Sequence, residues 1–401
     1  MKAWLIGAAM AAVGVVAWSG ALAAPPLEAF GRLPAVELMR LSPNGDKFAF
    51  VTVVGEDRKL IVATLAGKAL IAAPVGQTKV VDARWAGDDH LLVTTSSTVD
   101  LRAAFQFKYE FQSVVQIDVS NSKGFTVFKD AKDIAPVVAG QFGAASAGGK
   151  WSGYFAGISF ERSVSRGFVF DHGWADLYRV DLETGRPEVA MRGGPGIQGW
   201  VVGTDGAIAA TERYDERSGR WSLQAGGVTG KTVLDRKSPI GVIGLEGPGR
   251  TPGTAVVGDN TGDRSTIEEV SLTDGSVTRL LDGVGVEGLL HDPSTGLLIG
   301  ARTLREPGAV FFDPKLEALY ADTRKAFPEF QVRLESFSRD LGRISWRPRG
   351  RAIPAPIGSW TSPAATPSRS ASCTRTSSPP TWPPRSSCRS RPPTDWRWTA
   401  S

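Results

Sequence analysis

The sequence predicts an all-β fold of the β-propeller class, and three observations lead to this prediction. A short pattern recurs along the chain, in which apolar residues flank a polar one at the end of a strand and a turn follows. The copies are spaced like propeller blades, and turn residues recur between them. Helix is scarce, and the best candidate is 314–327, where apolar residues fall at roughly helical spacing.

Six copies of the pattern define the repeat. Their equivalent points are Ala63, Ile117, Val180, Leu223, Val270 and Phe312. The spacings between them are 54, 63, 43, 47 and 42 residues. A four-stranded blade takes about 40 to 50 residues. A pair of β-sandwiches would also contain many short strands, but it would not repeat one strand-end pattern, so the propeller is favoured.

Further strands are expected directly after turns rich in Gly, Asn and Asp, which supply the backbone angles of a tight reversal. We expect these strands over 47–53, 90–95 and 207–211. The turns that precede them lie at 43–46, 87–89 and 204–206.

The first 23 residues have the features of a secretory signal peptide. An apolar run from Ala3 to Trp18 is followed by small residues, and we expect cleavage near Ala23 or Ala24. The run is shorter than the roughly 20 residues that span a bilayer. We therefore expect a periplasmic or secreted protein with no membrane contact after signal cleavage.

The charge distribution argues against a nucleic-acid partner. The net charge is +5, but residues 345–401 contain nine arginines and one acid, a net of +8, so residues 1–344 carry +5 − 8 = −3. A mildly acidic folded part does not offer the basic face that nucleic acid requires. Both cysteines, Cys373 and Cys388, also fall in this last segment, so no disulfide is expected in the propeller.

Residues 345–401 are rich in Pro, Ser, Arg and Trp, and we interpret them as the product of a shifted reading frame. Trp has a single codon, so the alternative frame is fixed at some positions: Trp360-Thr361 must encode Asp, and Asp395-Trp396 must encode Leu. With G or C at most third positions, the second frame restores the repeat with its marker at Trp360, 48 residues after Phe312. A seventh blade would put its marker there.

Three segments are therefore expected. They are a signal peptide over 1–23, a β-propeller over 25–344, and a frame-shifted tail over 345–401 that we expect to be disordered. The parent protein would have seven blades, of which about six are in frame here.

Several segments resemble the prolyl oligopeptidase family of serine peptidases, especially its secreted bacterial acylaminoacyl and dipeptidyl peptidase-like members. They are residues 41–50, 85–92, 287–293 and 312–316. The second frame adds Ala-Asp-Gly-Leu-x-Leu-Asp-Gly, similar to the strand by which the family passes into its α/β-hydrolase domain. The resemblance implies a propeller that caps an active site and admits short, flexible peptides.

The catalytic chemistry of that family is not found in this sequence. No Ser stands in a Gly-x-Ser-x-Gly elbow, and the nearest approach is Ser146, which has Ala144 where the first Gly belongs. We therefore predict no catalytic, cofactor-binding or metal-binding residues and no cofactor. His90, His172 and His291 each lie beside an Asp in a turn-like setting and are interpreted as simple hydrogen-bonding residues.

Three other motifs have structural explanations. The pairs Asp88-Asp89 and Glu268-Glu269 could bind a cation or a peptide amine, but turns and solvated strand faces carry such pairs routinely. Residues 226–232 imitate a phosphate loop, yet Ala225 replaces its first Gly, and a hairpin turn explains them better.

Two functions remain in competition. In the first, the chain is the substrate-gating propeller of a serine peptidase that hydrolyses short peptides, inactive here because the frame changes before the catalytic domain. In the second, it is a stand-alone secreted propeller that binds a protein or peptide partner. The sequence does not fix the oligomeric state or the peptide specificity.

Overall fold

The computed structural model describes residues 36–54, 57–76, 78–100, 108–163, 167–262, 265–305, 308–328, 330–349, 358–361 and 398–400. The expected signal peptide and both cysteines lie outside these residues. Within the described ranges, no helix combines the length and the apolar character needed to cross a bilayer.

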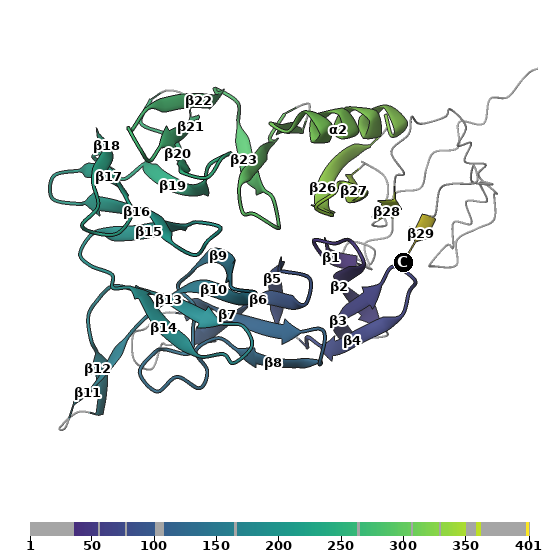
Figure 1. The fold of residues 1–401 in the computed structure, drawn as a ribbon, viewed down its shortest axis with the longest axis horizontal. Coiled ribbons are helices and arrows are strands. Elements are labelled where there is room, and N and C mark those ends of the chain that lie inside the picture. The colour runs from purple at the N-terminus through teal and green to yellow at the C-terminus, as the bar shows by residue number, and fades with distance from the viewer. Residues whose placement is uncertain are drawn as a thin grey trace, which may run out of the picture. The chain divides into compact units, whose positions relative to one another are not determined.

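The first three sheets are antiparallel and four-stranded (Figure 1). The first contains β1 (Val36–Leu41), β2 (Lys47–Val54), β3 (Asp57–Thr64) and β4 (Ala69–Pro74). The second contains β5 (Lys79–Ala86), β6 (His90–Asp100), β7 (Lys108–Asp118) and β8 (Lys123–Thr126). The third contains β9 (Gly140–Ala147), β10 (Lys150–Gly157), β13 (Asp176–Asp181) and β14 (Pro187–Met191). A separate hairpin of β11 (Phe160–Ser163) and β12 (Gly167–Phe170) is inserted between β10 and β13.

The next sheets repeat the arrangement. The fourth contains β15 (Ile197–Val202), β16 (Ile208–Asp215), β17 (Arg220–Ala225) and β18 (Thr232–Lys237). The fifth contains β19 (Ile243–Pro248), β20 (Thr254–Asp259), β21 (Thr266–Ser271) and β22 (Val277–Asp282). The sixth has three strands, β23 (Val286–His291), β24 (Leu298–Thr303) and β25 (Ala309–Phe311). These six sheets are blades one to six of a β-propeller, as the sequence predicts.

The last sheet follows the single helix of the described residues, α2 (Pro314–Ala326). It contains β26 (Gln331–Phe337), β27 (Arg343–Arg349), β28 (Gly358–Thr361) and β29 (Trp398–Ala400). β27 crosses the boundary expected between residues 344 and 345, and Ser345 and Trp346 are buried. β28 pairs with β27 through Trp360 and Ile344. The expected seventh marker position therefore lies in the third strand of this sheet.

The repeat read from the sequence is the third strand of each blade. Five of the markers lie in β3, β7, β13, β17 and β21, and the sixth, Phe312, directly follows β25. The turns expected at 43–46, 87–89 and 204–206 connect the first and second strands of their sheets. In β13, for example, Val180 packs in the cluster shared with Val114 of blade two, and Leu177 packs in the cluster shared with Trp200 of blade four.

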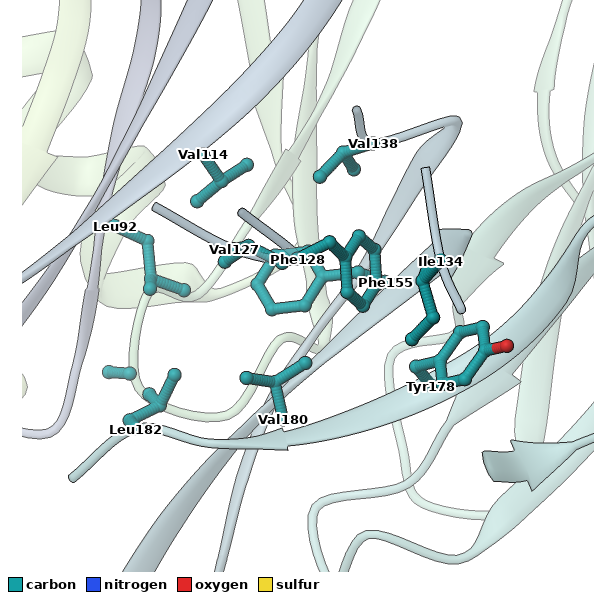
Figure 2. Packing of buried hydrophobic residues seen from close by; sticks show 11 residues of the cluster. Leu92, Val114, Val127, Phe128, Ile134, Val138, Phe155, Tyr178, Val180 and Leu182 are labelled. Atoms are coloured by element: carbon teal, nitrogen blue, oxygen red, sulfur yellow. The ribbon is translucent and has the colours of Figure 1, made fainter. Parts of the chain in front are cut away.

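Apolar clusters lie between successive sheets. Between blades two and three, Phe128 packs against Phe155 and Tyr178 with ring centroids 6.4 Å and 5.3 Å apart (Figure 2). Val114 and Val180 enter the same cluster from β7 and β13. Phe128 has a φ of 64°, which is rare for a bulky residue and is held here by packing around its ring.

Helix α2 occupies the place of a fourth strand in blade six. Asp313 caps its first turn by accepting hydrogen bonds from the backbone N–H groups of Lys315 and Leu316. Glu317 accepts the N–H of Phe311, so an edge donor of β25 is satisfied by the helix (2.9 Å). Tyr320 stacks on Trp346 of β27 with ring centroids 5.7 Å apart. The helix predicted over 314–327 is confirmed.

Candidate functional site

The first strands of the sheets share a β-bulge. These strands contact one another from sheet to sheet, as β1 does with β5 and β26, and as β15 does with β9 and β19. In six of them one extra residue interrupts the pairing with the second strand. The extra residues are Glu37, Val81, Gln198, Glu246, Glu287 and Glu335. Bulges re-aim side chains and are common beside functional sites, so the first strands carry the candidate site.

Most of the charges on the first strands are paired with one another. Arg40 of β1 contacts Asp82 of β5 at 3.0 Å and Glu335 of β26 at 3.2 Å. Glu335 also contacts Arg347 at 3.0 Å, and Glu287 of β23 pairs with Arg333 of β26. Burial alone would raise the pKa of Asp82, but the charges of Arg40 and Arg84 outweigh it and hold that pKa below its usual value.

The chain of ion pairs stops at blade five, where Glu246 is the bulge residue. No basic side chain of the described residues pairs with Glu246 or with its neighbour Glu212 on β16. Glu212 is only 6% exposed and accepts hydrogen bonds from Trp221 Nε1 (2.7 Å) and the N–H of Leu245 (3.0 Å). The carboxylates of Glu212 and Glu246 are therefore neighbours, and the hydrogen bonds that Glu212 accepts come from neutral donors.

Both carboxylates have raised pKa values. Burial is the main cause for Glu212, and the negative charge of Glu246 adds to it; loss of hydration raises the pKa of Glu246. Glycines leave room for both side chains. A Cβ at Gly199 would lie 3.1 Å from Glu212 Oε2, and one at Gly258 would lie 2.9 Å from Glu246 Oε1. An amine or another cation bound here would favour the ionised forms of both acids.

The three histidines have different settings. His90 is buried and its Nδ1 accepts a hydrogen bond from Gln116 Nε2 at 3.0 Å. His172 donates from Nδ1 to the carbonyl of Trp174 at 2.8 Å. These two are hydrogen-bonding residues, as predicted. His291 differs, because neither of its ring nitrogens makes a hydrogen bond within the described structure and its Nε2 is buried; burial, with the nearby charge of Arg84, lowers its pKa to about 4.

The paired acids of the sequence are structural. Asp88 accepts the N–H of Asn44 at 2.8 Å, and Asp89 forms a 2.7 Å ion pair with Lys47 across two turns. Glu268 and Glu269 do not lie on a solvated strand face. Both are buried and paired, Glu268 with Arg236 at 2.7 Å and Glu269 with Arg250 at 2.8 Å.

Other motifs are also accounted for. The loop of residues 226–231 connects β17 to β18 as a hairpin turn. Across the described ranges, no three His, Cys, Asp or Glu side chains are grouped so as to hold a metal ion.

Sequence reasoning missed Glu212 and Glu246. A signal for the bulges is present: an apolar residue, then Glu or Gln, then Gly occurs at 197–199, 245–247 and 286–288. Each copy begins within a first strand. The partner across the bulge cannot be read from this pattern, because it depends on the register of the second strand.

No family model matches the chain, and no curated protein is similar to it in sequence. Among solved structures, it is similar to an acylaminoacyl peptidase of Pyrococcus horikoshii, with 15% identity, a TM-score of 0.40, and coverage of 79% of this chain and 51% of the other. It is also similar to a structure of prolyl endopeptidases, with 13% identity, a TM-score of 0.45, and coverage of 82% of this chain and 48% of the other. A β-propeller domain of Myceliophteria thermophila is similar as well, with 12% identity, a TM-score of 0.42, and coverage of 83% of this chain and 98% of the other. The chain thus spans about half the length of the matched peptidase chains.

Proposed function

We propose that this chain is the substrate-gating propeller of a secreted prolyl oligopeptidase family serine peptidase that hydrolyses short peptides. In this proposal the signal peptide directs the protein to the periplasm or the medium, and a shift of reading frame separates the propeller from its catalytic domain. The chain as it stands is then inactive, because the hydrolase chemistry belongs to the parent protein.

One observation carries the proposal. In the last sheet, the third strand falls at Gly358–Thr361, which is where the second frame, with G or C at most third positions, would encode the seventh copy of the repeat. A genuine extension of a six-bladed protein has no reason to encode a blade in another frame. The prolyl oligopeptidase-like segments at 41–50 and 312–316 support the same reading.

The first-strand surface suits a peptide ligand. Glu212 and Glu246 offer two carboxylates with no basic partner among the described side chains. The α-amino group of a short peptide is a cation of suitable size and would restore charge balance there. We therefore place the amino end of the peptide at this pair of acids.

The reading-frame proposal is tested by resequencing the gene from the codon of Arg343 to beyond that of Ser401. A single-frame correction should open a sequence containing Gly-x-Ser-x-Gly followed by Asp and His. The repaired protein should hydrolyse short peptides and should be labelled by a fluorophosphonate. If no correction opens such a frame, a stand-alone binding propeller is the better account.

Peptide binding is tested separately by titrating the chain with trialanine and with N-acetyl-trialanine. We expect the free amine to bind about tenfold more tightly, a difference of about 1.4 kcal/mol. Glu246→Gln should remove that preference. Glu188→Gln is the control, because Glu188 is an exposed residue of β14 paired with Arg179. Equal binding of both peptides by the unchanged protein would contradict this role of the acids.

A further inference from the structure

Buried polar atoms without partners are concentrated in blade six. Among the described residues, five buried side-chain atoms make no hydrogen bond, and three of them belong to the β23–β24 hairpin: His291 Nε2, Ser294 Oγ and Arg302 Nε. The other two face a carboxylate, because His172 Nε2 lies 3.3 Å from Asp176 and Arg347 Nε lies 3.0 Å from Glu335. Among these five, only the three hairpin atoms have no counter-group. Buried polar atoms without a partner in a native structure call for an explanation.

Arg302 is the most unusual of the three. It lies opposite Gly288, which directly follows the bulge residue Glu287. A Cβ at Gly288 would lie 3.2 Å from its Nη2, so the glycine leaves the space that the guanidinium occupies. Arg302 forms neither an ion pair nor a side-chain hydrogen bond within the described structure. Its Nε–H donor is buried without an acceptor, and a buried donor left unpaired is costly.

The same position in blade four carries the opposite charge. Glu212 lies opposite Gly199 after the bulge at Gln198, as Arg302 lies opposite Gly288 after Glu287. The repeat thus places a long charged side chain over a glycine twice, once as an acid and once as a base. This equivalence indicates that the unpaired Arg302 belongs to the first-strand site and is not an isolated defect of blade six.

We propose that Arg302 binds a carboxylate group of a ligand at the first strand of blade six. Since Nε is buried, the carboxylate would engage the two terminal nitrogens, Nη1 and Nη2, in a bidentate arrangement that a single ammonium cannot offer. The carboxylate comes either from the C-terminus of a short peptide, which rests on the proposed function, or from a free organic acid.

Three probes distinguish these sources: trialanine, trialanine amide and acetate. The unchanged protein should bind trialanine about tenfold more tightly than its amide, by titration calorimetry. Arg302→Gln should bind both peptides equally. Arg279→Gln is the matched control, because it also removes one positive charge but from an exposed arginine of β22 paired with Asp282. If the acid and the amide bind the unchanged protein equally, or if the preference survives in Arg302→Gln, the proposal is overturned while peptide binding stands.

If neither peptide binds, that result counts against the proposed function. Acetate then tests whether Arg302 binds a free carboxylate. A rise in the melting temperature with acetate in the unchanged protein, absent in Arg302→Gln, would support a site for a free carboxylate. No rise would overturn the proposal. Without ligand, Arg302→Gln should melt at or above the temperature of the unchanged protein, since Arg302 makes no hydrogen bond or ion pair in the described structure. A lower melting temperature would show that Arg302 is held by the fold, which also overturns the proposal.

Discussion

Arg40 and Glu335 are separated by 295 residues in the chain, yet their side chains form a 3.2 Å ion pair. Arg40 also donates to Asp82 at 3.0 Å and to the carbonyl of Ala83 at 3.2 Å. A single guanidinium thus connects the first sheet to the second and to the last. The last sheet pairs its own strands, so side chains of this kind, rather than a shared strand, join it to blade one.

Arg40→Met should therefore destabilise the protein by about 2 kcal/mol. Removing one member of a buried pair costs about 3 to 5 kcal/mol, and the 24% exposure of the Arg40 side chain reduces that figure. Urea unfolding measures the change. Lys325→Met is the control, since its exposed pair with Asp322 should contribute less than about 1 kcal/mol. Equal effects of the two substitutions would show that Arg40 does not hold the sheets together.

Trp346→Ala tests whether residues after 344 belong to the folded propeller. Trp346 is 4% exposed, stacks on Tyr320, and lies in one apolar cluster with Phe311 and Leu334. Truncation of a buried Trp costs about 3 to 5 kcal/mol. Val284→Ala, at an exposed position, should change the unfolding free energy by less than about 0.5 kcal/mol. An effect of Trp346→Ala as small as that of the control would exclude β27 from the stable core.

The strands and turns could be predicted from the sequence because they depend on local patterns. Alternation in the third strands and turn residues at 43–46 and 204–206 do not require knowledge of any distant partner. The helix over 314–327 was predictable for the same reason. The inserted hairpin of β11 and β12 left only one trace in the sequence, the 63-residue spacing from Ile117 to Val180, and that extra length does not show how the inserted residues fold.

The candidate site could not be predicted in the same way. Whether Glu212 is buried depends on its register opposite Gly199, and whether Glu246 is paired depends on side chains from neighbouring blades. Glu268 shows the converse, because its partner Arg236 lies in the preceding blade and turns an apparently solvated acid into a buried ion pair. Charge pairing between sheets is a tertiary property that a local pattern does not contain.

Asp176 should make the protein sensitive to acid. Burial would raise its pKa, but hydrogen bonds from Ser159 Oγ, the N–H of Gly193 and the guanidinium of Arg192 hold the pKa below its usual value. A carboxyl with a lower pKa in the folded state contributes stability above its unfolded pKa of about 3.9, and this contribution is lost as pH falls through the folded value.

Asp176→Asn removes that contribution. We expect the variant to be less stable than the unchanged protein at pH 7 by about 2 kcal/mol, the usual cost of unpairing buried polar groups. The difference should shrink below pH 4, when the unchanged protein also loses the charge. Urea unfolding at a series of pH values measures it. A difference that is constant from pH 7 to pH 3 would mean that the charge of Asp176 does not matter.

Glu212 should show the opposite dependence on pH. Its pKa is raised in the folded protein, so the ionised form is disfavoured there and unfolding relieves this cost at neutral pH. As pH falls below the unfolded pKa of about 4.3, the carboxyl is protonated in both states and the cost disappears. The unchanged protein should thus gain stability on mild acidification, against the trend set by Asp176.

Glu212→Gln isolates the effect, because an amide oxygen can still accept the hydrogen bonds from Trp221 and Leu245. The variant should be more stable than the unchanged protein at pH 7 and equal to it near pH 4. A cationic ligand should reverse the order at neutral pH, since it stabilises only the carboxylate. The same unfolding series with and without trialanine measures both effects. Greater stability of the unchanged protein at pH 7 without ligand would mean that Glu212 already has a cationic partner, which would remove the case for a peptide amine at this position.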